Sequence, residues 1–256
     1  MQSEARVPYR AWGLLLVAAL LVLWEISART WVQSPNWPPV TQILRAGAAG
    51  LASGELVTVF VSSLGRMLAG FGIGAALGVV MGLLMGRIRV LQDALGPLVE
   101  LLRPIPIPAL VPPLILLLGI DTTMKVTVVA FATFFPVLVN TMSGVQSVEK
   151  TALDVARTFQ VSPTRTLLQV VLPASMPYVM VGLRTSLALA LIVTVVAEMI
   201  SGSEGIGYHI VTLQFAMRAG EMYATILLLA VLGYLLNYGM LGVERRVLHW
   251  FRRAPG

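Results

Sequence analysis

The sequence predicts an all-α membrane protein with about six transmembrane helices in a single domain. Hydrophobic residues make up 57% of the 256-residue chain and charged residues only 12%, with a mean hydropathy of +0.85. An ordinary soluble domain carries roughly 25% charged residues. The apolar residues are also gathered in long stretches, and about 20 of them suffice to cross roughly 30 Å of hydrocarbon as a helix. These observations exclude a soluble globular protein.

Six apolar stretches are the candidate spans, at approximately 11–28, 57–86, 95–119, 126–145, 174–200 and 222–243. The first stretch could be a signal peptide. We favour an anchor, because residues 23–26 continue it where a small-residue cleavage site would stand. A link rich in proline and tryptophan follows at 31–39, and then a weakly amphipathic helix at 41–51, which is expected at a membrane interface.

The second span carries a strip of glycines at steps of four: Gly70, Gly74, Gly78, Gly82 and Gly86. Such a strip leaves one face of the helix without side chains, so another helix can approach closely. We expect static packing along this face, with a sliding or hinge surface as the alternative.

Prolines interrupt the third span, at Pro97, Pro104, Pro106, Pro108, Pro112 and Pro113. A straight helix is excluded, because proline removes backbone donors and kinks helices. The freed carbonyls need partners from neighbouring helices or a water-filled cavity. We therefore predict that Arg103, Pro104 and Pro106 form a broken segment beside a transport path, with a simple kink as the alternative.

The stretch at 149–173, between the fourth and fifth spans, is polar but patterned as helix. Its apolar residues recur at the spacing of one helical face, at Val148, Ala152, Val155, Ala156 and Phe159. Ser162 followed by Pro163 is typical of the N-cap and first position of a second short helix. Two short helices in a membrane loop predict a docking surface. The alternative is a helix lying on lipid headgroups.

Six spans place both termini on the same side. With 149–173 inside, the basic residues on the cytoplasmic side are Arg6, Arg10, Arg87, Arg89, Lys150, Arg157, Arg165, Arg245, Arg246, Arg252 and Arg253. Those outside are Arg29, Arg45, Lys125 and Arg218. This excess of inner positive charge agrees with the positive-inside rule, so both termini are predicted to be cytoplasmic.

Three charged residues fall inside the second and fifth spans, Arg66, Arg184 and Glu198. Because an unpaired charge in hydrocarbon costs at least a few kcal/mol, each needs a partner or water. Arg66 and Glu198 fall at similar depth, which predicts an ion pair serving as an outer gate or as a structural bridge. Arg184 and Arg103 are further candidates for a path. The alternatives are that Arg103 pairs with Glu100 and that Arg184 extends to the inner surface.

Several functions are disfavoured by composition. The chain has no cysteine and two isolated histidines, His209 and His249, so neither a disulfide framework, a metal site nor catalysis is expected. No G-x-x-x-x-G-K-[ST] phosphate loop occurs, so a nucleotide would have to bind to a partner. The positive charge is explained by membrane orientation, and no nucleic acid is expected.

The 149–173 loop resembles the cytoplasmic coupling loop of ABC-importer permeases, whose motif reads E-A-A, three residues, G, nine residues, I-x-L-P. The matching positions are Asp154, Val155, Ala156, Gln160, Val170, Leu172 and Pro173. Asp154 and Val155 replace the family's Glu and first Ala, and Gln160 stands in place of glycine. Glycine would supply a permissive backbone there, whereas Gln cannot without strain. The break at Ser162 and Pro163 is the alternative place for the turn.

Further motifs from about 55 to 245 look like the permeases of the nitrate, sulfonate and taurine branch. They are Ser63-Leu64-Gly65-Arg66 with Gly70-Phe71, Arg103-Pro104-Ile105-Pro106, Val171-Leu172-Pro173, Gly182-Leu183-Arg184, Ala197-Glu198-Met199 and Gly205-Ile206-Gly207. The resemblance implies a type I ABC importer permease fold with a cytoplasmic coupling helix. It implies that the chain forms the path for a small, anionic solute such as a sulfonate, a nitrate-like oxyanion or a carboxylate.

The resemblance also implies partners in a bacterial inner membrane: a cytoplasmic ATPase dimer that binds ATP and Mg, a second permease subunit expected to be an identical copy, and a periplasmic or lipid-anchored solute-binding protein. Contact with the ATPase would fall to Asp154, Val155, Ala156, Arg157, Phe159, Gln160, Leu172 and Pro173. The chain itself would be neither an enzyme nor a cofactor protein. An ion-gradient carrier or channel is the alternative, but carriers commonly show related halves and no such repeat is evident.

Overall fold

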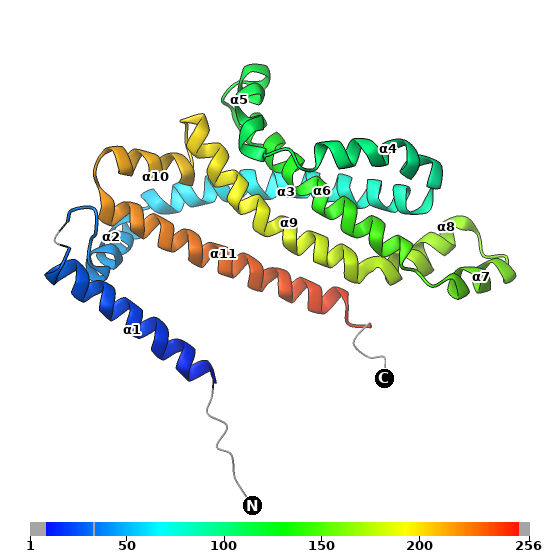
Figure 1. Cartoon of the computed structure of the whole chain (residues 1–256), viewed down its shortest axis with the longest axis horizontal. Helices are drawn as coiled ribbons and strands as arrows, with labels where there is room; N and C mark the ends of the chain where they lie inside the picture. Colours follow the sequence, from blue (N-terminus) through cyan, green and yellow to red (C-terminus); the bar gives the residue numbers. More distant parts are fainter. Residues whose placement is uncertain (1–8, 33, 251–256) are drawn as a thin grey trace, which may run out of the picture. The chain divides into compact units, whose positions relative to one another are not determined.

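The computed structural model describes residues 9–32 and 34–250, and within these ranges the chain is helical without strands (Figure 1). The helices are α1 (Tyr9–Thr30), α2 (Val40–Ala52), α3 (Glu55–Arg87), α4 (Arg89–Leu102), α5 (Ile107–Leu118), α6 (Thr122–Gln146), α7 (Lys150–Thr158), α8 (Pro163–Thr166), the π-helical turn η1 (Leu167–Val171), α9 (Leu172–Ser201), α10 (Ile206–Phe215) and α11 (Ala219–Val247). Arg6, Arg252 and Arg253, predicted to be cytoplasmic, lie outside the described residues.

Contacts divide the chain into two compact units. The first contains residues up to 58 together with 209–229, and the second contains 59–208 together with 230 onward. In the first unit the predicted interfacial helix is α2. The preceding link is held by Trp37, whose ring stacks on Trp24 with centroids 4.9 Å apart. The Trp24 indole donates to the carbonyl of Pro38 at 3.1 Å, so this link is packed against α1.

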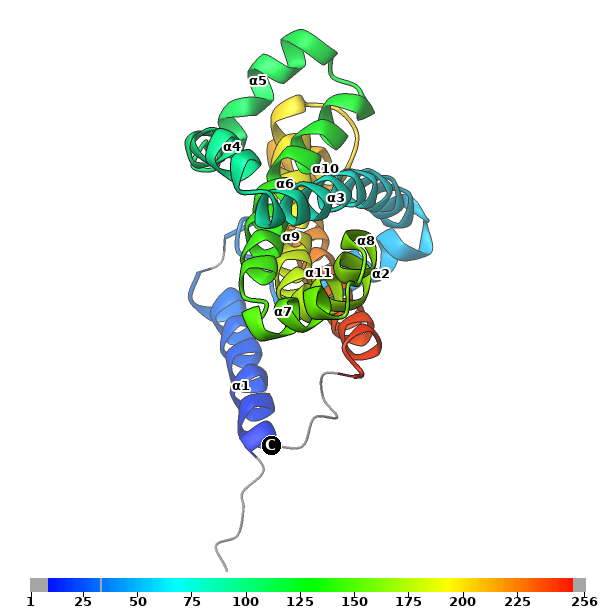
Figure 2. The ribbon, with the colours of Figure 1, turned by 90° about the vertical axis from the view of Figure 1, so that its right-hand side faces the viewer.

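The second unit is organised around α6, which lies between α3 and α9 (Figures 1 and 2). The glycine strip of α3 faces α6: a Cβ at Gly78 would lie 2.8 Å from the Phe134 carbonyl, and one at Gly82 would lie 2.6 Å from the Thr141 Cβ. On the other side of α6, a Cβ at Gly144 would lie 2.7 Å from the Tyr178 Cβ of α9. Small residues therefore allow α6 to pack closely against both neighbours.

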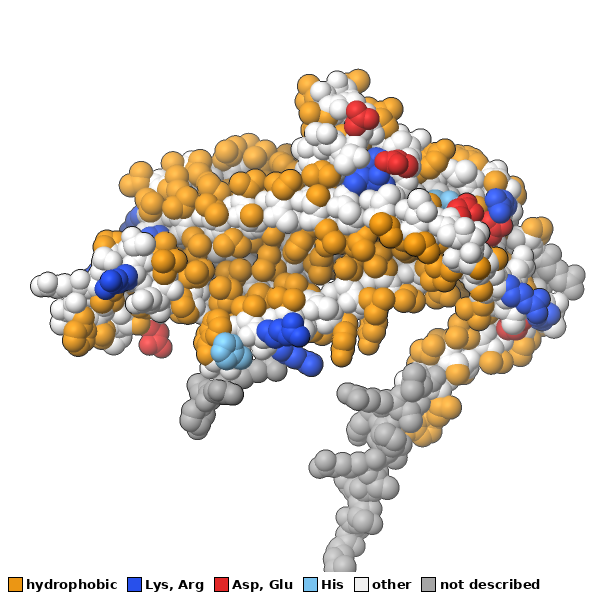
Figure 3. Space-filling view, turned by 180° about the vertical axis from the view of Figure 1, so that it is seen from behind, with side chains coloured by type: hydrophobic (Ala, Val, Ile, Leu, Met, Phe, Trp, Pro, Cys, Tyr) orange, Lys and Arg blue, Asp and Glu red, His pale blue; other side chains and the backbone are white. Residues whose placement is uncertain are grey.

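Four helical segments of the described chain are long and apolar enough to cross a membrane: Glu55–Arg87, Thr122–Gln146, Pro163–Ser201 and Ala219–Val247. A fifth crossing results if α4 and α5 are one span bent by 96°. This bend falls within the predicted proline-rich third span. The predicted first span lies within α1. Figure 3 shows hydrophobic side chains over most of one face, with charged ones in small groups.

Two expectations from the sequence are corrected. The stretch at 201–221, between the predicted fifth and sixth spans, is not an open loop, because it contains α10, in which Ile206, Ile210 and Leu213 are buried at helical spacing. The second short helix of the 149–173 loop is not separate, because α8 continues through η1 into α9 as one segment of 39 residues. Pro173 does not begin this helix. It lacks an N–H donor, and it follows a π turn in which Leu172 N–H donates to the Leu167 carbonyl.

Candidate functional site

The first candidate site is the predicted coupling loop, whose α7 presents an uneven surface. Phe159 at its C-terminus is 77% exposed and Val155 is 51% exposed. Ala156, on the same predicted face, is buried within the chain. Asp154 and Arg157 form an exposed ion pair at 3.1 Å. The structure therefore splits the predicted apolar face into an exposed part and a part that packs internally.

Gln160 supplies the turn after α7 despite not being glycine. Its φ is 51°, in the left-handed region. Gln160 N–H donates to the Arg157 carbonyl and Val161 N–H to the Ala156 carbonyl, both at 2.9 Å, which is the hydrogen-bond pattern of a Schellman cap. In this motif the left-handed position usually holds glycine, and another residue there costs roughly 1–2 kcal/mol. The backbone strain predicted for a non-glycine residue in this turn is therefore found at Gln160.

The predicted restart at Ser162 is also found. The Ser162 side chain accepts from Arg165 N–H at 3.4 Å, and Pro163 is the first residue of α8. The remaining two predicted coupling residues, Leu172 and Pro173, are half-buried at the start of α9. The turn at Gln160 and the cap at Ser162 together separate α7 from the long segment that follows.

The second candidate site is a buried charge cluster centred on Glu198 of α9, which is 0% exposed. Arg66 of α3 donates to its Oε1 at 2.9 Å, forming the ion pair predicted from depth. The Ser63 hydroxyl lies 2.8 and 2.9 Å from the two carboxylate oxygens and accepts from Ile206 N–H at 2.9 Å. Gly207 N–H donates to Glu198 Oε2 at 3.1 Å. One carboxylate thus joins α3 and α9 to the start of α10.

Two further charges complete this cluster. Glu204, with a side chain 66% exposed, pairs with the second terminal nitrogen of Arg66 at 2.5 Å. Lys125 of α6 is 1% exposed and donates to the Ser203 hydroxyl at 2.7 Å and to the Glu204 carbonyl at 3.0 Å. The formal charges of the two basic side chains and the two acidic side chains cancel. The cluster therefore has no net charge with which to attract an anion.

The Gly205-Ile206-Gly207 motif lies against this carboxylate. Gly205 has a φ of +119°, and a Cβ there would overlap the Glu198 carboxylate, whereas a Cβ at Gly207 would overlap the Val195 carbonyl. Sequence reasoning missed Ser63 and Lys125 as members of the cluster. Ser63 precedes Arg66 by three residues and so shares its helix face, a signal that could have identified it.

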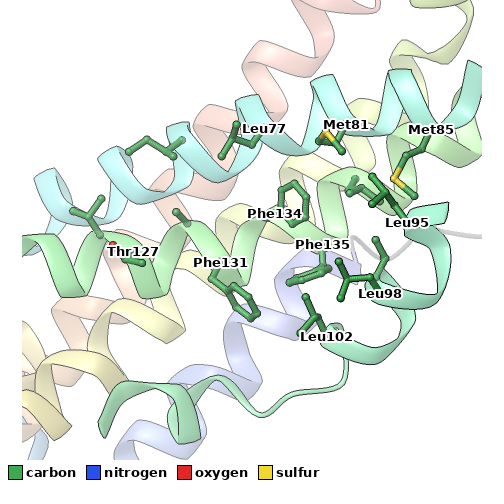
Figure 4. Close-up of a pocket in the computed structure, with 15 residues that line it drawn as sticks. Leu77, Met81, Met85, Leu95, Leu98, Leu102, Thr127, Phe131, Phe134 and Phe135 are labelled. Carbon is green, nitrogen blue, oxygen red and sulfur yellow. The ribbon is translucent and has the colours of Figure 1, made fainter. Parts of the chain in front are cut away.

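The broken segment lies between α4 and α5, with Arg103 at the end of α4 and Pro104 and Pro106 in the bend. Arg103 and Glu100 line one small cavity of about 440 Å³, but no ion pair joins them in the described structure. A larger cavity of about 600 Å³ lies between α3, α4 and α6 (Figure 4). Figure 4 shows the phenylalanines of α6 and the leucines of α4 along it, at Phe131, Phe134, Phe135, Leu95, Leu98 and Leu102. No charged side chain lines this larger cavity, so it cannot bind an anion by charge.

Arg184, the remaining predicted path residue, is exposed on α9. Its Nε donates to the Asn237 side-chain oxygen of α11 at 3.2 Å. It contacts neither the buried cluster nor the large cavity. The structure therefore brings Arg66 and Glu198 together and leaves Arg103 and Arg184 at two other places.

Comparison with known proteins agrees with this architecture. The family described as "Binding-protein-dependent transport system inner membrane component" matches residues 74–249. A Bacillus subtilis (strain 168) protein named as an aliphatic sulfonates transport permease, SsuC, is 33% identical over 95% of this chain and 89% of its own length. The Escherichia coli (strain K12) taurine transport system permease protein TauC is 29% identical over 91% of this chain and 87% of its own.

The fold also matches a solved transporter. A chain of the MetNI methionine ABC transporter in an inward-facing conformation superposes with a TM-score of 0.67 at 17% identity, covering 75% of this chain and 96% of that one. At this identity the match establishes the fold alone, which is that of a type I importer permease. By the family match and the similarity to SsuC, the chain belongs to the binding-protein-dependent ABC transporter permeases, in the branch that includes the sulfonate and taurine permeases.

Proposed function

We propose that this chain forms the transmembrane path of an ATP-driven importer for a small anion and that its 149–173 loop contacts the ATPase. The main observation in support of the proposal is the structure of this loop. A capped helix presents Val155 and Phe159 outward, and it is followed directly by a helical segment that continues into a span. An exposed aromatic at the end of an amphipathic helix suits helix-in-groove recognition, in which a few buried anchors supply most of the affinity.

The proposal includes partners and orientation. The ATPase subunits would bind ATP and Mg and hydrolyse the nucleotide, a second copy of this chain would complete the path, and a solute-binding protein would deliver the solute. The loop and both termini would be cytoplasmic, in the inner membrane of a bacterium. The relatives that transport sulfonates and taurine by name support an anionic solute.

We assign the cluster around Glu198 to a fixed bridge rather than to an outer gate. Breaking a buried ion pair costs about 3–5 kcal/mol. Here the carboxylate is also held by Ser63 and by the Gly207 N–H, so opening would expose several donors together. The cluster fastens the turn before α10 to α3 and α9.

The test is co-purification of the partner ATPase with variants of the loop. Phe159→Ala removes an exposed side chain and should weaken docking by about 2 kcal/mol, roughly 30-fold in affinity. Thr164→Ala, an exposed change in α8, is the matched control and should leave binding unchanged. Ala156→Asp is a poor test, because Ala156 is buried and a charge there would disrupt the loop's own packing.

Each outcome bears on the proposal. Loss of the ATPase from Phe159→Ala, with normal membrane insertion and retention by Thr164→Ala, supports the importer. Full binding by Phe159→Ala would refute the assignment of Phe159 as the anchor of the ATPase contact.

A further inference from the structure

Arg184 is a cation in the middle of a membrane-spanning helix. It follows Leu172 by 12 residues and precedes Ser201 by 17, so it lies roughly 18 and 25 Å along α9 from its two ends. A charge that faces lipid within a span costs about 3 kcal/mol or more, so the face that carries Arg184 is expected to meet water or protein.

The hydrogen bond to Asn237 orients the guanidinium without neutralising it. Only Nε is engaged, and in the described part of the chain no carboxylate lies within 4 Å of Arg184. Arg66, by contrast, pairs with both Glu198 and Glu204. The two terminal nitrogens of Arg184 are therefore available as a planar fork, the geometry that matches two oxygens of a carboxylate or a sulfonate.

Polar groups surround Asn237 on α11. Tyr234 lies about one turn away and Tyr238 is the next residue. Both are exposed, and their rings are stacked with centroids 6.4 Å apart. Tyrosines of membrane helices concentrate at the two interfaces, whereas Tyr234 lies near the middle of the 29-residue α11. The Arg184–Asn237 hydrogen bond and the stacked tyrosines thus place polar groups along one stretch of α9 and α11.

We propose that Arg184, positioned by Asn237, is an oxyanion-binding point on the transport path, with Tyr234 and Tyr238 supplying hydroxyl groups beside it. This inference rests on the proposed function and assigns the anion contact within the chain to one side chain. The neutral cluster around Glu198 and the hydrophobic cavity of Figure 4 lack the charge for this role.

The absence of cysteine from the chain permits a direct test. Ala188 lies one turn beyond Arg184 on α9 and is exposed. Ala188→Cys, in the full complex in nanodiscs, would be labelled with anionic 2-sulfonatoethyl methanethiosulfonate and with its cationic trimethylammonium analogue. We expect the anionic reagent to react about tenfold faster than the cationic one, after each rate is normalised to that of a free thiol. A tenfold increase in rate is the low end of what electrostatic focusing produces in clefts. Adding Arg184→Gln should abolish this preference, and adding Arg184→Lys should retain it.

Val80→Cys is the matched control, because Val80 is exposed on the side of α3 opposite the glycine strip. It should react with neither reagent if that side faces lipid. The proposal would be overturned if Ala188→Cys reacted with neither reagent or with both equally. Disulfide formation between two copies at this position would also overturn it, because a second copy would then cover the face. Labelling requires no ATP hydrolysis. Full ATPase binding by Phe159→Ala would therefore refute the coupling assignment without altering this result.

Discussion

Glu198→Gln should destabilise the second unit by about 3 kcal/mol. The change keeps the shape of the side chain but removes its charge, so Arg66 loses the partner at 2.9 Å and keeps only the exposed Glu204. Breaking a buried pair costs about 3–5 kcal/mol, and the remaining pair places the effect at the lower end. The glutamine NH2 must also face a donor, either Arg66 or the Gly207 N–H. The midpoint of thermal unfolding, followed by far-UV circular dichroism of the helices, should shift down by roughly 6–12 °C.

Glu204→Gln provides the matched control, because it removes a carboxylate from the same guanidinium. The Glu204 side chain is 66% exposed, so the free energy of unfolding should fall by at most about 1 kcal/mol. Equal small shifts for both variants would refute the reasoning that burial sets the cost. Reversing Arg66 and Glu198 together should not restore stability, because Ser63 and Gly207 would then donate toward an arginine.

Three further changes test the packing and the turns. Gly74→Ala should lower the thermal stability, because a Cβ would overlap Thr133 and the Ala130 carbonyl. Gly72→Ala is the control on the same helix: its Cβ would meet nothing within 4 Å, so the change should be neutral or stabilising by up to about 1 kcal/mol. Gln160→Gly should stabilise the isolated chain by up to about 1 kcal/mol by relieving the left-handed backbone, and an unfolding temperature below wild type would contradict this. Ser63→Ala should cost about 1–3 kcal/mol by the same measurement, because the Ile206 N–H loses its acceptor; an unchanged transition would argue against that bond.

Features encoded locally could be predicted from the sequence. The glycine strip, the bend at the prolines and the cap at Ser162 each depend on residues within a few positions of one another. The pairing of Arg66 with Glu198 could also be predicted, because depth in a membrane span can be counted along each helix.

Features that depend on distant contacts were missed. Lys125 falls one residue before the predicted fourth span and was assigned to an outer loop, yet it is buried within the first turn of α6 by contacts with Ser203 and Glu204. α10 was hidden because Gly202, Gly205 and Gly207 indicated a loop. The Glu198 carboxylate leaves no room for a side chain at Gly205, and the Val195 carbonyl of α9 leaves none at Gly207.

The length of the segment Pro163–Ser201 has a consequence for where the loop lies. Its 39 residues measure roughly 58 Å, whereas about 20 residues suffice to cross the hydrocarbon. The apolar residues are concentrated toward Ser201, and Thr164, Arg165 and Gln169 lie at the other end. In the proposed function, the surplus length would extend beyond the headgroups and hold α7 away from the lipid surface, where the ATPase could reach it from more than one side.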